Sequence, residues 1–269
     1  LNFKQKVDDY LKRTLLQKNA TLFMLVLAAR DLLPFKMTGA LPKELNSSIS
    51  HLRAYGYCIF KDLLEVDKVQ KIVEFIDGNL SQASRVDTDR RIMGAERISP
   101  LIHDEVSNHS DILKLSEYYL SSSLHLQMTM AAKLEFAFGN LGSGQGWHRD
   151  SYSRQIKSMI YLSDVGHANG PFEYLEKSHT YINIMRELKL KKEQNKWNTY
   201  TRFSDDFVQE YRQKYNLKAK KICAPKGTIL IFDSRGVHRG SPIQDGSRYA
   251  VTNYFIKKTH HQGDQSVYG

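Results

Sequence analysis

Three side chains that can bind a metal ion lie in two short motifs far apart in the sequence, and the fold must bring them together. His148 and Asp150 flank Arg149 in a Gly-Trp-His-Arg-Asp segment, and His238 follows ninety residues after His148 (238 − 148 = 90). In an extended segment, residues i and i+2 project to the same side, so His148 and Asp150 can face one ion while Arg149 points away. Two imidazoles and one carboxylate leave positions open for a chelating cosubstrate and dioxygen, which is typical of non-haem Fe(II) oxygenases.

Two predicted strands frame His238 and supply a candidate for binding a cosubstrate. Residues 225–233 indicate a turn followed by a buried β-strand, which would deliver His238 from the loop beyond it. A further strand, residues 248–256, starts with Arg248 and holds Thr252 on the same face. A guanidinium is a planar, permanently charged fork, so Arg248 could hold the far carboxylate of a dicarboxylate cosubstrate.

Three stretches of the chain are similar to a known family. Residues 147–150, 169–179 and 227–248 resemble the phytanoyl-CoA dioxygenase family of Fe(II)/2-oxoglutarate oxygenases, and the likeness extends over about residues 50–258. The resemblance implies an α+β fold with a mainly β core, a double-stranded β-helix of the jelly-roll or cupin type with flanking helices. It also implies an enzyme that uses Fe(II), 2-oxoglutarate as cosubstrate, and dioxygen.

The same resemblance assigns roles to individual residues. Carried over residue by residue, it makes His148, Asp150 and His238 the catalytic iron ligands, and Arg248 the partner of the distal carboxylate of 2-oxoglutarate. Asp150 also bears on the reaction, because halogenating relatives carry a small residue at that position and leave room for chloride. An intact Asp150 therefore favours hydroxylation.

Some positions near the site stay open at this level. In the family a serine or threonine near the final histidine assists the arginine, and both Ser241 and Thr252 qualify. Gln145, just before the first ligand motif, could bind the cosubstrate or line the substrate pocket. The family's Gly-Ser-His stretch has Lys177 at the glycine position here, which leaves the conformation of that turn open.

The length and composition suit a single elaborated enzyme domain. The chain has 269 residues, and 41% of them are hydrophobic, enough to bury a sizeable core. Cys58 and Cys223 lie in apolar, strand-like segments, where reduced packing thiols are the default, so we expect a reducing cytoplasm. The apolar run at residues 22–29 is too short to cross a membrane, and we expect no transmembrane segment.

The pattern of apolar residues predicts two parts of the chain. Residues 1–55 indicate helices that pack outside the barrel, and residues 56–269 form the oxygenase domain. Within that domain we expect the following elements: a strand at 57–60, a helix that begins with a capping-box-like 62–65 and ends at Gly78, and strands at about 125–138 and 155–162.

A basic, helical insertion at residues 181–221 carries much of the charge of the chain. It holds eleven Lys and Arg against five Asp and Glu, a net +6 of the chain's +10. A lysine-rich helical face is often simply solvated. The alternative is a lid whose Lys189, Lys191 and Lys192 attract an anionic metabolite, such as an acyl-CoA, a nucleotide-sugar, or a glycan or lipid intermediate.

Aromatic residues in the same insertion raise the question of nucleic acid as a partner. Phe203, Phe207, Tyr211 and Tyr215 recur every four residues, so they mark one helical face and predict packing rather than base stacking. We therefore expect a small-molecule partner and no nucleic acid, with the oligomeric state left open.

Parts of this pattern also occur in two other classes of protein. His-Arg-Asp is also a protein-kinase motif, but Gln155 stands where kinases require asparagine, and no glycine-rich phosphate loop precedes it. A non-catalytic barrel that binds a metal or ligand as a sensor is the remaining alternative. A sensor would have no need for an intact set of three metal ligands and Arg248, which favours the enzyme.

Overall fold

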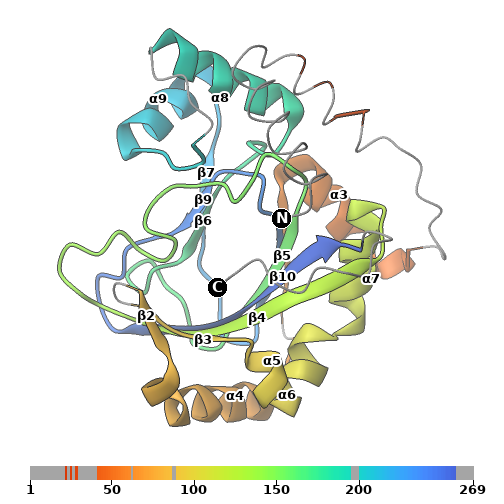
Figure 1. The fold of residues 1–269 in the computed structure, drawn as a ribbon, viewed down its shortest axis with the longest axis vertical. Helices are drawn as coiled ribbons and strands as arrows, with labels where there is room; N and C mark the ends of the chain where they lie inside the picture. Colours follow the sequence, from red (N-terminus) through yellow and green to blue (C-terminus); the bar gives the residue numbers. More distant parts are fainter. Residues whose placement is uncertain are drawn as a thin grey trace, which may run out of the picture.

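Two antiparallel β-sheets form the body of the molecule (Figure 1). The computed structural model describes residues 22, 25, 28–29, 41–61, 63–86, 89–194 and 200–258. Over these residues the larger sheet has seven strands in the order β1-β8-β5-β10-β4-β3-β2, and the smaller has three in the order β7-β6-β9. The strands are β1 (Tyr57–Phe60), β2 (Ser84–Val86), β3 (Asp89–Met93), β4 (Leu124–Glu135), β5 (Ile156–Tyr161), β6 (Phe172–Leu175), β7 (Ala219–Ile222), β8 (Ile229–Asp233), β9 (His238–Gly240) and β10 (Ser247–Lys257).

Helices cover the outer face of the larger sheet. Alternate residues of its strands, including Ile160 on β5 and Val251 on β10, join an apolar core with these helices. Burial of this surface is the main stabilising contribution to the fold. The helices on this side are η1 (Lys43–Leu45), α3 (Asn46–Tyr55), α4 (Val66–Gly78), η2 (Leu80–Gln82), α5 (Ala95–Ile98), α6 (Pro100–Ile102), η3 (His103–Ser107) and α7 (Ser110–Leu120).

A second core lies between the two sheets. Tyr161 on β5 and Phe232 on β8 pack there against Phe172 and Tyr174 on β6, with the rings of Phe172 and Phe232 4.5 Å apart. The two sheets thus face each other across aromatic side chains, which confirms the predicted double-stranded β-helix with flanking helices.

Most of the strands expected from the sequence are present. The predicted strand at 57–60 coincides with β1, and the strands expected near 125–138, 155–162 and 248–256 correspond to β4, β5 and β10. The predicted start of α4 was wrong, because the helix begins at Val66 and its N-cap is Glu65, whose side chain makes no capping hydrogen bond. Its predicted end at Gly78 is confirmed.

The insertion folds as a helical pair between β6 and β7. Its helices are α8 (Tyr181–Glu193) and α9 (Asp205–Tyr215), and Thr180 and Ser204 cap their N-termini through side-chain oxygens. The aromatic stripe packs as predicted, with Phe207 and Tyr211 buried in an apolar cluster under α9. Ring contacts join successive members of the stripe, Phe203, Phe207, Tyr211 and Tyr215.

The predictions about the cysteines, a membrane span and the N-terminal helices have different outcomes. Cys58 is a buried free thiol as predicted, whereas Cys223 is free but exposed, so its predicted packing role was wrong. No helix in the described part of the chain is long and apolar enough to span a membrane. The helices predicted before residue 41 lie outside the described residues, apart from four helical positions at 22, 25, 28 and 29.

Candidate metal centre

Backbone pairing with the smaller sheet positions the first ligand motif. The amide of His148 donates to the carbonyl of His238 over 2.9 Å, and the amide of His238 donates back to His148 over 2.7 Å. The Asp150 amide donates to the carbonyl of Ser234 at 3.0 Å. Both ligand motifs are thereby held in one β-ladder, so the sheet register sets how their side chains face each other.

The three predicted ligands converge on one point. His148, Asp150 and His238 each offer a ligand atom, and these atoms all lie within 4.8 Å of one another. The Nδ1 atoms of His148 and His238 lie 2.9 and 2.8 Å from the carbonyls of Gly146 and Gly236. Since a carbonyl only accepts, each Nδ1 carries the proton, and each Nε2 presents a lone pair to the cluster.

The protonation states also fit a metal site. Burial lowers the pKa of His148, and burial together with His148 lowers the pKa of His238 to about 3, so both imidazoles are neutral near pH 7. Burial alone would raise the pKa of Asp150, but Lys157 and His238 outweigh it and hold that pKa well below its usual range. Two neutral imidazoles and one carboxylate are the donor set that a divalent transition metal requires.

Lys157 contacts the site and was not among the residues predicted from the sequence. Its Nζ lies 2.6 Å from Asp150 Oδ2 and 4.2 Å from the centre of the Tyr254 ring. The other oxygen, Oδ1, lies 3.9 Å from His148 Nε2. Lys157 therefore engages one carboxylate oxygen and leaves the other directed toward the histidines. The signal available in the sequence was its spacing of two residues from inward-facing Met159 on β5, which puts both side chains on one face of the strand.

Arg248 is a buried cation with no acidic side chain within ion-pair distance among the described residues. It is 3% exposed at the start of β10, and one of its terminal nitrogens donates to the carbonyl of Gly170. Among the described residues its Nε has no hydrogen-bond partner, and burial lowers the pKa of the guanidinium. A buried charge of this kind is costly unless a counter-charge completes it, so the residues fit a dicarboxylate such as 2-oxoglutarate.

The remaining predicted residues differ in where they lie. Thr252 is buried and lies on the same strand face of β10 as Arg248, four residues along. The hydroxyl of Ser241 instead donates to Glu173 over 3.2 Å, and Glu173 also pairs with Arg239. Among the described residues, no hydrogen bond joins Ser241 to Arg248.

Gln145 and Lys177 both adopt left-handed backbone conformations. Gln145 is exposed in the loop before the ligand motif, with a φ of 56°. Lys177 has a φ of 66°, the region that glycine enters without strain. The turn is thus formed with lysine in the family's glycine position. It leads into His179, which is buried, and whose Nε2 lies 3.2 Å from the carbonyl oxygen of Arg53.

Within the described part of the insertion, Arg202 is an exposed cation beside the cluster. Arg202 forms a β-bridge with His148, and its guanidinium donates to the carbonyl of Gly144 over 2.6 Å. Arg202 and Lys157 each lower the pKa of His148 through their charge, after burial, which has the larger effect. The sequence did not single out Arg202, because nothing in its neighbourhood distinguishes it from the other bases of the insertion.

A jelly-roll barrel with a His-Asp-His cluster defines the class of Fe(II)/2-oxoglutarate oxygenase-type proteins. The family model for phytanoyl-CoA dioxygenase (PhyH) matches residues 52–249, and the chain belongs to that family. It is accordingly an enzyme of the Fe(II)/2-oxoglutarate oxygenase type, as the sequence predicted. Iron and 2-oxoglutarate, the expected cofactors, are those of the family, and the described cluster suits the metal.

Solved structures agree with the fold. The epimerase SnoN from nogalamycin biosynthesis, in complex with Fe3+, alpha ketoglutarate and nogalamycin RO, is 14% identical, with a TM-score of 0.61 over 84% of this chain and 94% of that one. Iron-bound EctD from S. alaskensis is 15% identical, with a TM-score of 0.57 over 84% and 82%. HygX from Streptomyces hygroscopicus, with nickel and 2-oxoglutarate bound, is 13% identical, with a TM-score of 0.55 over 80% and 87%. No curated protein matches the sequence significantly.

Proposed function

We propose that the protein is an Fe(II)- and 2-oxoglutarate-dependent hydroxylase of a small or medium-sized anionic metabolite. The convergence of His148, Asp150 and His238, with ligand atoms within 4.8 Å of one another, is the observation that carries the proposal. When bound, Fe(II) would supply the oxidising chemistry, in which the substrate, dioxygen and 2-oxoglutarate are converted to a hydroxylated product, succinate and carbon dioxide.

The protein's own residues would bind and orient. His148 and His238 would donate their Nε2 lone pairs and Asp150 one carboxylate oxygen, while Lys157 holds the other oxygen. Arg248 would bind the distal carboxylate of 2-oxoglutarate in the barrel interior, where burial excludes water. Of the polar candidates beside it, we favour Thr252, because it shares a face with Arg248, and we leave Ser241 and Gln145 as secondary candidates for cosubstrate binding.

The charge beside the cluster supports an anionic substrate. Arg202 is exposed next to His148, whereas the Lys157 side chain is 13% exposed and pairs with Asp150. Lys191, one of the lysines expected to attract substrate, is buried against Glu187 and cannot serve. We therefore assign the attraction to the exposed Arg202, which suits an acyl-CoA, a nucleotide-sugar, or an anionic glycan or lipid intermediate.

We propose the same division of the chain that the sequence suggested. Residues 1–55 would pack on the barrel, and residues 56–269 would form the oxygenase domain. The insertion at 181–221 would act as a lid through the extended segment at 201–203, whose backbone pairs with Trp147 and Arg149. Two free thiols suit a reducing cytoplasm.

An anaerobic titration tests the site. Fe(II) followed by 2-oxoglutarate should give the visible charge-transfer band of the chelated complex in the wild-type protein. The band should be absent in Asp150→Ala and weakened in Arg248→Met. Folded wild-type protein without a band would refute the cofactor assignment and favour a non-catalytic sensor.

The reaction type and substrate class need separate measurements. Turnover under oxygen-18 gas should place the label in the product, whereas an epimerisation or a ring closure would leave the product unlabelled. Succinate formation should be stimulated by an acyl-CoA or a nucleotide-sugar more than by the uncharged pantetheine thioester or free sugar. Arg202→Gln should remove that preference, and Lys189→Gln, on the exposed face of α8, should keep it.

A further inference from the structure

We propose that Glu187, on inserted helix α8, is a positioning residue for the metal centre and acts through Arg149. The inference rests on the proposed metal site of His148, Asp150 and His238. Arg149 stands between two of those ligands in the sequence, and its side chain is fully buried on the side away from the cluster. Glu187 is likewise fully buried, although it belongs to the insertion and not to the barrel.

The Arg149 guanidinium joins the two segments that carry the ligands. One terminal nitrogen donates to the backbone carbonyl of Arg235, three residues before His238. The other donates to Glu187 Oε2. The Arg149 side chain therefore links the segment that contains His148 and Asp150 to the residues just before His238. The backbone hydrogen bonds between His148 and His238 link the same two segments a second time. A guanidinium holds two partners in fixed directions, so its position constrains both segments.

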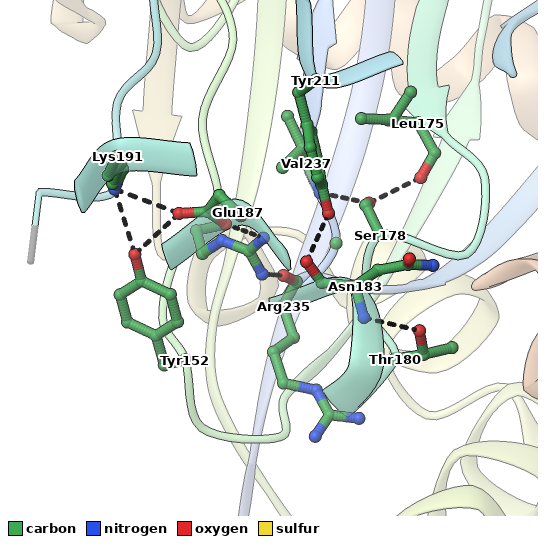
Figure 2. A network of polar contacts seen from close by, with 12 residues as sticks. Tyr152, Leu175, Ser178, Thr180, Asn183, Glu187, Lys191, Tyr211, Arg235 and Val237 are labelled. Atoms are coloured by element: carbon green, nitrogen blue, oxygen red, sulfur yellow. Dashed lines mark hydrogen bonds and ion pairs between the residues drawn. The ribbon is translucent and has the colours of Figure 1, made fainter. Parts of the chain in front are cut away.

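Glu187 fixes where that guanidinium lies. Its second oxygen, Oε1, accepts from the hydroxyl of Tyr152 and from Lys191 Nζ, both at 3.0 Å (Figure 2). Lys191 also donates to Tyr152 and, over 2.7 Å, to the carbonyl of Tyr200. Both carboxylate oxygens are thus occupied, and three partners, Arg149, Tyr152 and Lys191, restrict the rotation of Glu187.

The same network reaches the other edge of the ligand strand. The carbonyl of Thr201, one residue after the Lys191-bonded Tyr200, accepts from the Arg149 amide over 2.8 Å. The amide of Phe203 donates to the carbonyl of Trp147 over 2.9 Å. Segment 147–149 is consequently held by backbone hydrogen bonds to β9 on one edge and to the insertion on the other. Glu187 is the anion that pairs both with Arg149 in this segment and with Lys191 in the insertion.

The charges explain why Glu187 cannot be neutralised without effect. Arg149 and Lys191 are both buried cations, and Glu187 is their common ion-pair partner among the described residues. Without its charge the two cations would repel each other in an environment that excludes water, and Arg149 would have to move. Movement of Arg149 would displace the backbone between His148 and Asp150.

Binding of Co(II) to the metal-free protein tests the inference without any turnover. Glu187→Gln should remain folded by circular dichroism, bind Co(II) about 10- to 100-fold more weakly, and show altered visible absorption of the bound ion. Glu187→Asp should recover part of the affinity. The matched control is Glu193→Gln, which removes a carboxylate from the same helix where it pairs with Lys214 on the surface. This control should bind Co(II) as the wild type does.

Two results would overturn the inference. A Glu187→Gln protein that melts earlier but binds Co(II) with unchanged affinity and spectrum would make the network a fold-stabilising element only. If Glu187→Gln fails to fold, the double substitution Arg149→Met/Glu187→Met replaces the pair by apolar groups, and unchanged Co(II) binding there would have the same meaning. Full Co(II) affinity in Asp150→Ala would instead contradict the proposed metal site itself, so the two failures are distinguishable.

Discussion

His148 and His238 exchange both of their backbone hydrogen bonds, and their imidazole rings lie 4.4 Å apart. They are directly opposed residues of an antiparallel pair, whose side chains lie on the same side of the sheet. Two residues ninety positions apart in the sequence are therefore held together by backbone pairing, and their relative position does not depend on a flexible loop. The geometry of the proposed site depends on register, which one-residue slippage would destroy.

Loss of the carboxylate should weaken metal binding most directly. Asp150→Ala removes one of three donors from the cluster, and we expect Co(II) affinity to fall by at least about 100-fold, because loss of an indirect partner alone costs about 10- to 100-fold. Isothermal titration calorimetry of the metal-free protein measures this. Asp104→Ala, which removes an exposed carboxylate beside His103, should leave the affinity unchanged, and an equal loss there would point to a general effect of charge.

Replacement of Arg248 should separate cosubstrate binding from stability. Arg248→Met removes a buried cation with no acidic side chain within ion-pair distance among the described residues, so the melting temperature of the metal-loaded protein should not fall. The variant should lose about 1.5–3 kcal/mol of binding to 2-oxoglutarate, the usual contribution of a hydrogen bond to a charged group. Thermal shifts with and without 2-oxoglutarate under anaerobic conditions measure both quantities.

A control substitution keeps this prediction specific. Arg97 is an exposed arginine on α5, and Arg97→Met should keep the full stabilisation by 2-oxoglutarate. If Arg248→Met is stabilised by 2-oxoglutarate as strongly as the wild type, the distal carboxylate is bound elsewhere.

Stability should fall as the pH drops below 6.5, while most carboxylates are still ionised. Burial lowers the pKa of His179 to about 4 and, with His148, that of His238 to about 3, from an ordinary value of 6.5. Below pH 6.5 the unfolded chain takes up protons that these folded histidines refuse, so the free energy of unfolding decreases with decreasing pH. Each histidine contributes a slope approaching about 1.4 kcal/mol per pH unit.

Urea unfolding of the metal-free protein in steps from pH 7 to 5 measures that slope. In this window aspartate and glutamate stay mostly ionised, so histidines account for the change. His179→Gln should give a shallower dependence, because one of the buried neutral imidazoles is absent. An identical slope in the variant would mean that His179 titrates normally in the folded protein.

A buried polar cluster behind the site should contribute to stability. Asn253 on β10 is fully buried and makes four side-chain hydrogen bonds, to the carbonyl of Val106 and to the hydroxyls of Ser107, Thr129 and Ser158. Asn253→Ala leaves several of these groups unsatisfied and should lower the free energy of unfolding by about 1–3 kcal/mol or more. Chemical denaturation measures the change, and a loss below about 0.5 kcal/mol would show that the cluster rearranges without cost.

Much of the site was predictable because its signals are local. His148 and Asp150 share a side of an extended segment, and the apolar run before Asp233 predicts the strand that precedes His238. Arg248 and Thr252 follow from the two-residue period of a single strand. Each of these inferences needs no more than the spacing within a short stretch.

The rest depended on contacts between distant segments. Lys157, Arg202 and Glu187 come from a strand and two parts of the insertion, and each reaches the site only through tertiary packing. The burial of Lys191 escaped prediction for the same reason, since a lysine on a basic helix usually faces solvent. Helix α4 began later than predicted because residues with capping propensity do not by themselves mark where a helix starts.

The excursion that contains α8 and α9 begins and ends at directly paired residues, Leu175 on β6 and Ala219 on β7. In terms of connectivity it is a β-hairpin whose turn has been replaced by a helical subassembly, and the barrel register would survive its exchange for a short turn. Arg149 would lose its ion-pair partner, because that exchange removes Glu187 and exposes a guanidinium that is now buried. A protein without the inserted helices would therefore also need a different residue between His148 and Asp150. The insertion and the segment that carries these two side chains would have to change together.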